Sequence, residues 1–186
     1  MILKNVRVNW LNVLKPHKNL SGDDIFDLQI IIDKNDTKNL ETIKAAMESV
    51  LEDAKEKNGA KAIAGVKFQM KDGDSETDNA KGAEYLKGCY FFTAKNKKQP
   101  TCLKAVRVGN KIEKKEATEA DFYSGMYAVL EVSPYFYNTP AKRGITNYIN
   151  TVIKTRDGER LGKARAEIEI DFDDVGLAEE DDWAVL

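Results

Sequence analysis

The sequence predicts an all-β fold, a small barrel or sandwich, with one helix inserted between its strands. Three observations predict it: several segments alternate apolar and polar residues, one segment changes to helical spacing, and polar loops connect the segments. The chain has 186 residues, which suits one domain over residues 1–166 followed by a tail over residues 167–186.

Alternation identifies two strands near the N-terminus. In the first, the apolar side chains of one parity, expected to face the core, are Ile2, Val6, Val8 and Trp10. In the second, the corresponding set is Phe26, Leu28, Ile30 and Ile32. The segment between them, residues 15–24, has the composition of a loop.

The spacing changes in residues 37–57, where apolar side chains recur three and four residues apart. This pattern indicates an amphipathic helix, with Asp36 or Thr37 as its N-terminal cap and Gly59 as its stop. Residues 71–86 are polar and nearly free of large apolar side chains, so they are predicted to form a long mobile loop.

Four more strands are predicted over residues 88–95, 102–108, 125–137 and 144–155. In the third, the even-numbered side chains are apolar, so the outward positions hold Tyr127, Tyr135 and Tyr137. In the fourth, the expected core residues are Ile145, Ile149 and Ile153, and the outward residues include Tyr148, Lys154 and Arg156. A last alternating run, residues 168–172, leads into the tail.

The net charge of −2 conceals an uneven distribution. Residues 1–166 contain all 29 basic residues and 22 of the 31 acidic ones, a net charge of +7. Residues 167–186 contain the other nine acidic residues and no Lys or Arg. A basic body with an acidic tail is typical of proteins that bind an anionic partner.

Outward aromatic side chains and neighbouring basic residues form the pattern that single-stranded nucleic acid needs. Its unpaired bases stack on aromatic rings, and its phosphates require Lys or Arg alongside. The candidate contacts are Tyr90, Phe92, Lys95, Lys97, Lys98, Arg107, Tyr127, Tyr135, Tyr137, Lys142, Arg143, Tyr148, Lys154 and Arg156. Each alone is more often scaffold or solvated surface, so the prediction depends on their combination.

Five segments together resemble the tailed-bacteriophage single-stranded DNA-binding protein family. They are residues 87–95, 123–127, 135–138, 142–150 and 157–162. The resemblance spans nearly the whole chain and implies an OB-fold, a five-stranded Greek-key barrel. It further implies sequence-independent binding of single-stranded DNA during phage DNA replication or recombination.

The acidic tail is expected to regulate binding and to recruit replication proteins such as a polymerase or helicase–primase. Its candidate partner-binding residues are Asp181, Asp182, Trp183 and Leu186. Tails of this functional class often end in an aromatic residue, whereas this one ends Ala-Val-Leu, so Trp183 is expected to take that role. A homodimer is compatible with the sequence, and the choice between DNA and RNA is left open.

Two other readings are kept. The carboxylates of residues 72–78 have a spacing that a metal-dependent nuclease-associated module could use, although the loop lacks the glycine of a calcium loop. Alternatively, the acidic tail mimics nucleic acid and blocks another binding protein.

Catalysis and cofactors are not expected. The chain has no zinc spacing, no Walker loop and no GxGxxG motif, and its single histidine, His17, has no accompanying nucleophile signature. Without a signal-peptide layout or an apolar run of membrane-spanning length, it is expected in the cytoplasm, that of the host cell if a phage encodes it.

Overall fold

The computed structural model of this protein describes residues 1–161, and the predicted run at 168–172 and the acidic tail lie outside them. The strands are β1 (Ile2–Lys18), β2 (Asp24–Asp33), β3 (Lys71–Asp72), β4 (Cys89–Asn96), β5 (Thr101–Val108), β6 (Lys111–Glu116), β7 (Tyr127–Asn138) and β8 (Arg143–Arg156). The helices are α1 (Thr37–Asn58) and α2 (Ala60–Ile63), with short 3₁₀ turns at Glu84–Leu86 and Glu119–Asp121.

The described strands form one sheet in the order β3-β4-β2-β1-β7-β8-β5-β6. Neighbouring strands are antiparallel, except that β5 and β8 are parallel. The fold is therefore mostly β with one main helix, as expected, but residues 1–161 form eight strands rather than five. Strand β6 was not anticipated because all its residues are exposed, so it shows no apolar alternation.

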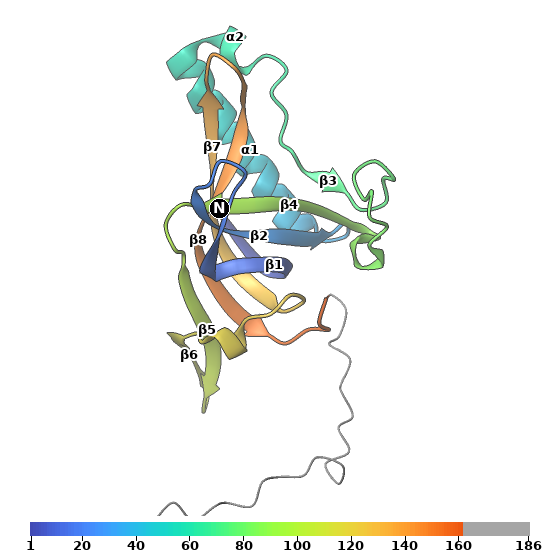
Figure 1. Ribbon diagram of the computed structural model, residues 1–186, viewed down its shortest axis with the longest axis vertical. Coiled ribbons are helices and arrows are strands. Elements are labelled where there is room, and N and C mark those ends of the chain that lie inside the picture. The colour runs from blue at the N-terminus through green and yellow to red at the C-terminus, as the bar shows by residue number, and fades with distance from the viewer. Residues whose placement is uncertain (162–186) are drawn as a thin grey trace, which may run out of the picture.

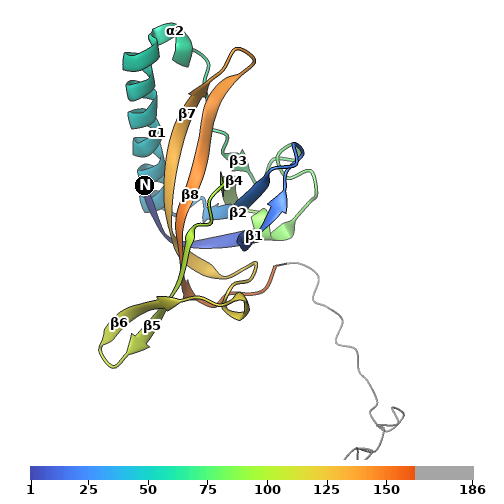
Figure 2. The same ribbon diagram turned by 60° about the vertical axis from the view of Figure 1, so that its left-hand side comes forward.

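Strands β4 and β8 approach each other although no strand pairing joins them. The Asn96 side chain of β4 donates a hydrogen bond to the Ile149 carbonyl of β8 at 3.0 Å. Because β2, β1 and β7 lie between these two strands in the sheet order, this contact curls the five strands towards each other. The β7–β8 hairpin extends beyond the curled part and runs beside α1 (Figures 1 and 2).

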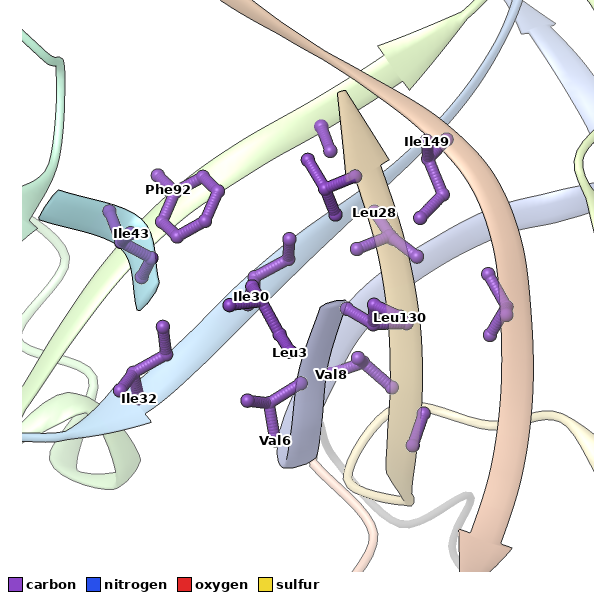
Figure 3. Close-up of a cluster of buried hydrophobic side chains, with 14 of the residues drawn as sticks. Leu3, Val6, Val8, Leu28, Ile30, Ile32, Ile43, Phe92, Leu130 and Ile149 are labelled. Atoms are coloured by element: carbon purple, nitrogen blue, oxygen red, sulfur yellow. The ribbon is translucent and has the colours of Figure 1, made fainter. Parts of the chain in front are cut away.

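The core lies inside this curl and is closed by α1. Leu28, Ile30 and Ile32 of β2 alternate into it, as predicted, and meet Leu130 of β7 and Ile43 of α1 (Figure 3). Helix α1 has the predicted limits: the Asp36 side chain accepts the Asn39 N–H, and Gly59 ends the helix. No helix within residues 1–161 is long and apolar enough to cross a membrane.

The prediction of which β1 side chains face the core is wrong at both ends of the alternating segment. Leu3, Val6 and Val8 are buried, whereas Ile2 and Trp10 are exposed. The pairing of β1 with β7 shifts between Leu3 and Val6, and its pairing with β2 shifts after Asn9. Each irregularity moves later side chains to the other face, so a strict period of two fails here.

A similar irregularity in β8 overturns the expected orientation of its last residues. The pairing with β7 shifts after Ile149, and Val152, rather than Ile153, enters the core. Lys154 consequently lies on the inward parity, with its ammonium 4.8 Å from the Tyr123 ring centroid and 2.7 Å from Asp157 Oδ1.

The burial of Leu130 in the core predicts how much its truncation destabilises the protein. Leu130 is fully buried among residues from β1, β2 and β8. We expect Leu130→Ala to lower the free energy of unfolding by about 2–5 kcal/mol, because the site cannot collapse around the cavity. Ile112→Ala on the exposed β6 is the control, with an expected change below about 0.5 kcal/mol. Chemical denaturation of both variants measures the difference, and equal values would contradict this account of the core.

Candidate nucleic-acid interface

A groove of about 520 Å³ opens on the outer side of the sheet. Its walls come from β2 and β4, from the loop 77–86, from the start of β8 and from Trp10 of β1. We call this feature the β2–β4 groove. The loop that closes one side lies beside β3 and β4 in Figure 1. The volume falls within the range of small-ligand pockets, and the groove offers aromatic, amide and basic side chains together.

Trp10 supplies the exposed ring of the β2–β4 groove. Its side chain is 52% exposed, and the Lys81 ammonium lies 5.3 Å from its ring centroid. The Trp10 backbone is left-handed, with φ 48°, and its N–H donates to Ser124 Oγ at 3.1 Å. Alternation in the sequence predicted that Trp10 faces the core. It is exposed because the pairing of β1 with β2 becomes irregular after Asn9, which the sequence pattern does not reveal.

The floor of the groove is a buried polar network. Asn9 Nδ2 donates to Gln29 Oε1 at 3.1 Å and to the Tyr85 hydroxyl at 2.9 Å. Asn9 and Gln29 are both buried, and Gln29 and Tyr85 line the groove. These bonds fix the side chains at the bottom of the groove, because breaking them would leave buried polar groups without partners.

Strand β4 directs Phe91, Thr93 and the predicted Lys95 to the groove, whereas the predicted Tyr90 does not line it. Phe92 does line its inner end, but it is 3% exposed in the core and packs edge-on against Phe68, so its faces are covered. Tyr90 shares its parity and lies under the Lys34 ammonium at 5.0 Å. The polar Thr93 and Lys95 share a parity with Phe91, a signal that could have identified the outward face of β4, although Phe91 itself is only 6% exposed and packs with Ile31 and Leu86.

The predicted basic residues are dispersed. Lys95 lines the β2–β4 groove, and the exposed Lys97 pairs with Asp23 at 3.1 Å beside the exposed Lys98. Arg107 is exposed on the β5–β6 hairpin, which projects away from α1 (Figure 2). At the tip of the β7–β8 hairpin Lys142 is exposed, whereas Arg143 donates to the Lys61 carbonyl at 2.9 Å. Sequence reasoning also missed Lys71 and Lys81, which line the groove.

The tyrosines of the β7–β8 hairpin form a second aromatic surface. Tyr135 and Tyr148 are 54% and 38% exposed, with ring centroids 5.8 Å apart. Because side chains alternate along β8, they lie on the face opposite Asn147, which lines the β2–β4 groove. Tyr137 is half-buried, with its ring across Gly144.

Tyr127 and Arg156 form a pair at the other end of the same two strands. The Arg156 guanidinium carbon lies 3.4 Å from the Tyr127 ring centroid, and its Nε donates to Asn5 Oδ1 at 3.0 Å. The guanidinium therefore covers one face of the ring, and a base could stack only on the other or on the guanidinium itself.

The sequence model of the Enterobacter phage Enc34 ssDNA-binding protein family matches residues 1–184. This chain belongs to that family. No curated protein matches it significantly.

Two solved structures of the Enc34 protein resemble the fold of this family member. The single-stranded DNA-binding protein from bacteriophage Enc34 in complex with ssDNA has 18% identity and a TM-score of 0.66, over 87% of this chain and 88% of that one. The same phage protein in another structure has 19% identity and a TM-score of 0.61, over 94% and 88% of the two chains. At these identities the likeness concerns the fold.

In this member of the Enc34 family, Lys34 fixes the acidic loop beside the groove. Its ammonium lies 2.6 Å from Asp72 Oδ1 and 2.7 Å from Asp74 Oδ2. Asp74 also accepts the Gly88 N–H at 2.9 Å, which ties the two ends of the loop together. At Gly73 a side chain would overlap the Leu86 carbonyl, so glycine is required for this close approach.

The same contacts bear on the metal-dependent alternative. Lys34 places a positive charge between two of the carboxylates that a metal would need. Asp78 accepts the Asp72 N–H at 2.9 Å and is turned to the backbone. Across residues 1–161, no three acidic, histidine or cysteine side chains are grouped to hold a metal ion.

The ion pairs make the loop sensitive to pH. Hydrogen bonds from Lys34 lower the pKa of Asp72 and Asp74 below the usual 3.8. Carboxyls with a lowered folded pKa stabilise the loop above pH 3.8, and this contribution is lost as the pH falls through the folded pKa. We expect amide hydrogen exchange of the loop, corrected for its intrinsic pH dependence, to lose protection progressively as the pH falls below about 4.

Lys34→Met should speed this exchange roughly two- to fivefold at neutral pH and weaken its pH dependence. Lys44→Met is the matched control, because Lys44 pairs only weakly with Glu48 on the exposed side of α1. If Lys34→Met leaves the exchange rates of the loop unchanged, the backbone hydrogen bonds hold the loop without the Lys34 ammonium.

Proposed function

We propose that this chain binds single-stranded DNA in the β2–β4 groove with little sequence preference, and coats and protects it during phage DNA replication and recombination. The observation that carries the proposal is the exposed Trp10 ring in a groove that Lys71, Lys81 and Lys95 line. A base can stack on the ring while phosphates reach the ammonium groups. Membership of the Enc34 family supports the assignment.

We further propose that the five strands from β4 to β8 in the sheet order form an OB barrel within a domain of residues 1–166. The hydrogen bond between Asn96 and Ile149 supports closure between β4 and β8. In OB-folds the face of the second and third strands binds oligonucleotides, and in the proposed barrel these strands are β2 and β4, which line the groove. Strands β5 and β6 would then be an insertion between barrel strands.

We assign binding rather than catalysis to this groove. Aromatic, amide and ammonium groups in its lining suit stacking and phosphate contacts, and the carboxylate of Asp78, which also lines it, accepts the Asp72 N–H at 2.9 Å. The neighbouring carboxylates of Asp72 and Asp74 are engaged by Lys34 and offer no general base free of that ammonium.

Single-stranded DNA should bind more tightly than duplex DNA of equal length, because a duplex hides the faces of its bases. If about five phosphates are neutralised, the slope of log affinity against log salt concentration should be near −3.5. Fluorescence anisotropy titrations with single-stranded DNA, duplex DNA and RNA at several salt concentrations measure both quantities. An affinity that does not depend on salt would contradict the proposal.

Trp10→Ala should weaken binding of single-stranded DNA by about 1–3 kcal/mol, the usual loss of one stacked base. Stability should change little, since the ring is half-exposed and makes no core contact. Anisotropy and thermal melting of the same preparation separate the two effects.

The comparison with Tyr148→Ala tests how far the strand extends. We propose that Tyr135 and Tyr148 contact only a longer strand, because neither ring lines the groove and both lie on the face of β8 opposite Asn147. Tyr148→Ala should therefore spare binding of an oligonucleotide of about 8 nucleotides and weaken that of one twice as long. If Trp10→Ala has no effect and Tyr148→Ala weakens binding of the shorter oligonucleotide, the binding site is the surface formed by Tyr135 and Tyr148 and not the groove.

We also propose that the acidic tail competes with DNA for the groove and recruits a replication partner. Both functions rest on the sequence: residues 173–186 contain six carboxylates, Trp183 and the terminal Leu186. Deleting residues 173–186 should tighten DNA binding at low salt, because carboxylates and phosphates attract the same cations. Trp183→Ala should leave DNA affinity unchanged but abolish pull-down of the phage polymerase or helicase–primase. Weaker DNA binding after the deletion would contradict the competition.

A further inference from the structure

The β2–β4 groove contains one buried hydrogen-bond acceptor without a partner. Asn147 of β8 is 5% exposed and lines the groove, and its Oδ1 has no donor within residues 1–161. Its cross-strand neighbour is Pro134, which has no N–H to offer. Buried side-chain oxygens without a donor are uncommon in folded proteins, so this atom points to a ligand that supplies one.

The surroundings of Asn147 define the chemistry of that ligand. The groove combines an exposed aromatic ring, Trp10, with buried amide groups such as Gln29, and Lys71, Lys81 and Lys95 line it as well. A flat group with N–H donors on its edge and a negative charge outside the groove satisfies all three features. A nucleobase with its phosphate has this form.

We propose that Asn147 Oδ1 accepts a hydrogen bond from the N–H edge of a nucleobase inserted into the β2–β4 groove. All four DNA bases carry such a donor: the amino groups of adenine, cytosine and guanine, and the imino N–H of thymine. The contact therefore detects that a base is present without selecting which one. The proposal rests on the proposed function and adds a base-edge contact to stacking and phosphate binding.

The Watson–Crick edge of thymine provides a sharp test, because its N3–H is the only N–H of the base. A thymidine oligonucleotide and its N3-methylthymidine counterpart offer the same rings and phosphates, and only the first can donate to Asn147. We expect the wild-type protein to bind the methylated strand roughly two- to tenfold more weakly, as for the loss of one hydrogen bond. In Asn147→Leu, a variant with the same branched arrangement of heavy atoms but without the acceptor, this preference should disappear.

The matched control is Asn150→Leu on the same strand. Asn150 does not line the groove and donates to Ser133 Oγ at 2.8 Å on the other face. It should keep the wild-type preference for the unmethylated strand. Thermal melting checks that both variants are folded, which we expect for Asn147→Leu because it removes a buried acceptor that has no partner.

Each result decides the proposal. An equal penalty for the methylated strand in wild type and Asn147→Leu would overturn it, since the penalty would then come from the added methyl group. The absence of any penalty in wild type would also overturn it and leave water as the donor to Asn147. Failure of the wild-type protein to bind the unmodified strand would instead refute the proposed function.

Discussion

The path of β1 is the constraint on which the groove depends. This strand lies between β2 and β7, so it joins the two halves of the sheet, and it contains two residues with left-handed backbone, Asn5 and Trp10. Asparagine tolerates this conformation, but for tryptophan it costs on the order of 1–3 kcal/mol. The hydrogen bond from the Trp10 N–H to Ser124 helps to hold the strained residue. As a result an indole that simple alternation would bury lies at the mouth of the groove.

Two aromatic surfaces with different physical character follow from this arrangement. In the groove, one exposed indole stands above a floor of buried amides whose positions are fixed by hydrogen bonds. On the β7–β8 hairpin, Tyr135 and Tyr148 are exposed with ring centroids 5.8 Å apart, and neither ring lines the groove. A base can enter the first surface, whereas it can only lie against the second. The groove is therefore better suited to hold a strand in one position.

Sequence reasoning succeeded where one face of a helix or strand is uniformly apolar and, for a strand, where the pairing is regular. Strand β2, the first part of β7 and helix α1 meet this condition, and their core residues and limits were predicted. It failed at the pairing shifts of β1 and β8, because an irregularity is set by neighbouring strands and leaves no local periodic signal. In β4 the consecutive aromatic residues 90–92 hid the parity, although Thr93 and Lys95 indicated it. The family and the basic character of the body were accessible from sequence, whereas the position of the groove required the structure.

The acidic loop lies beside the groove for which we propose DNA binding, where its carboxylates would repel phosphates. Phosphates are repelled by carboxylates within about 8 Å at physiological ionic strength. Here Lys34 pairs with both Asp72 and Asp74, and Asp78, which lines the groove, accepts a backbone N–H. The loop also brings Lys81 over Trp10 at 5.3 Å. Because Lys34 pairs with Asp72 and Asp74 and Lys81 points into the groove, the loop can form one side of the proposed binding site without repelling the strand.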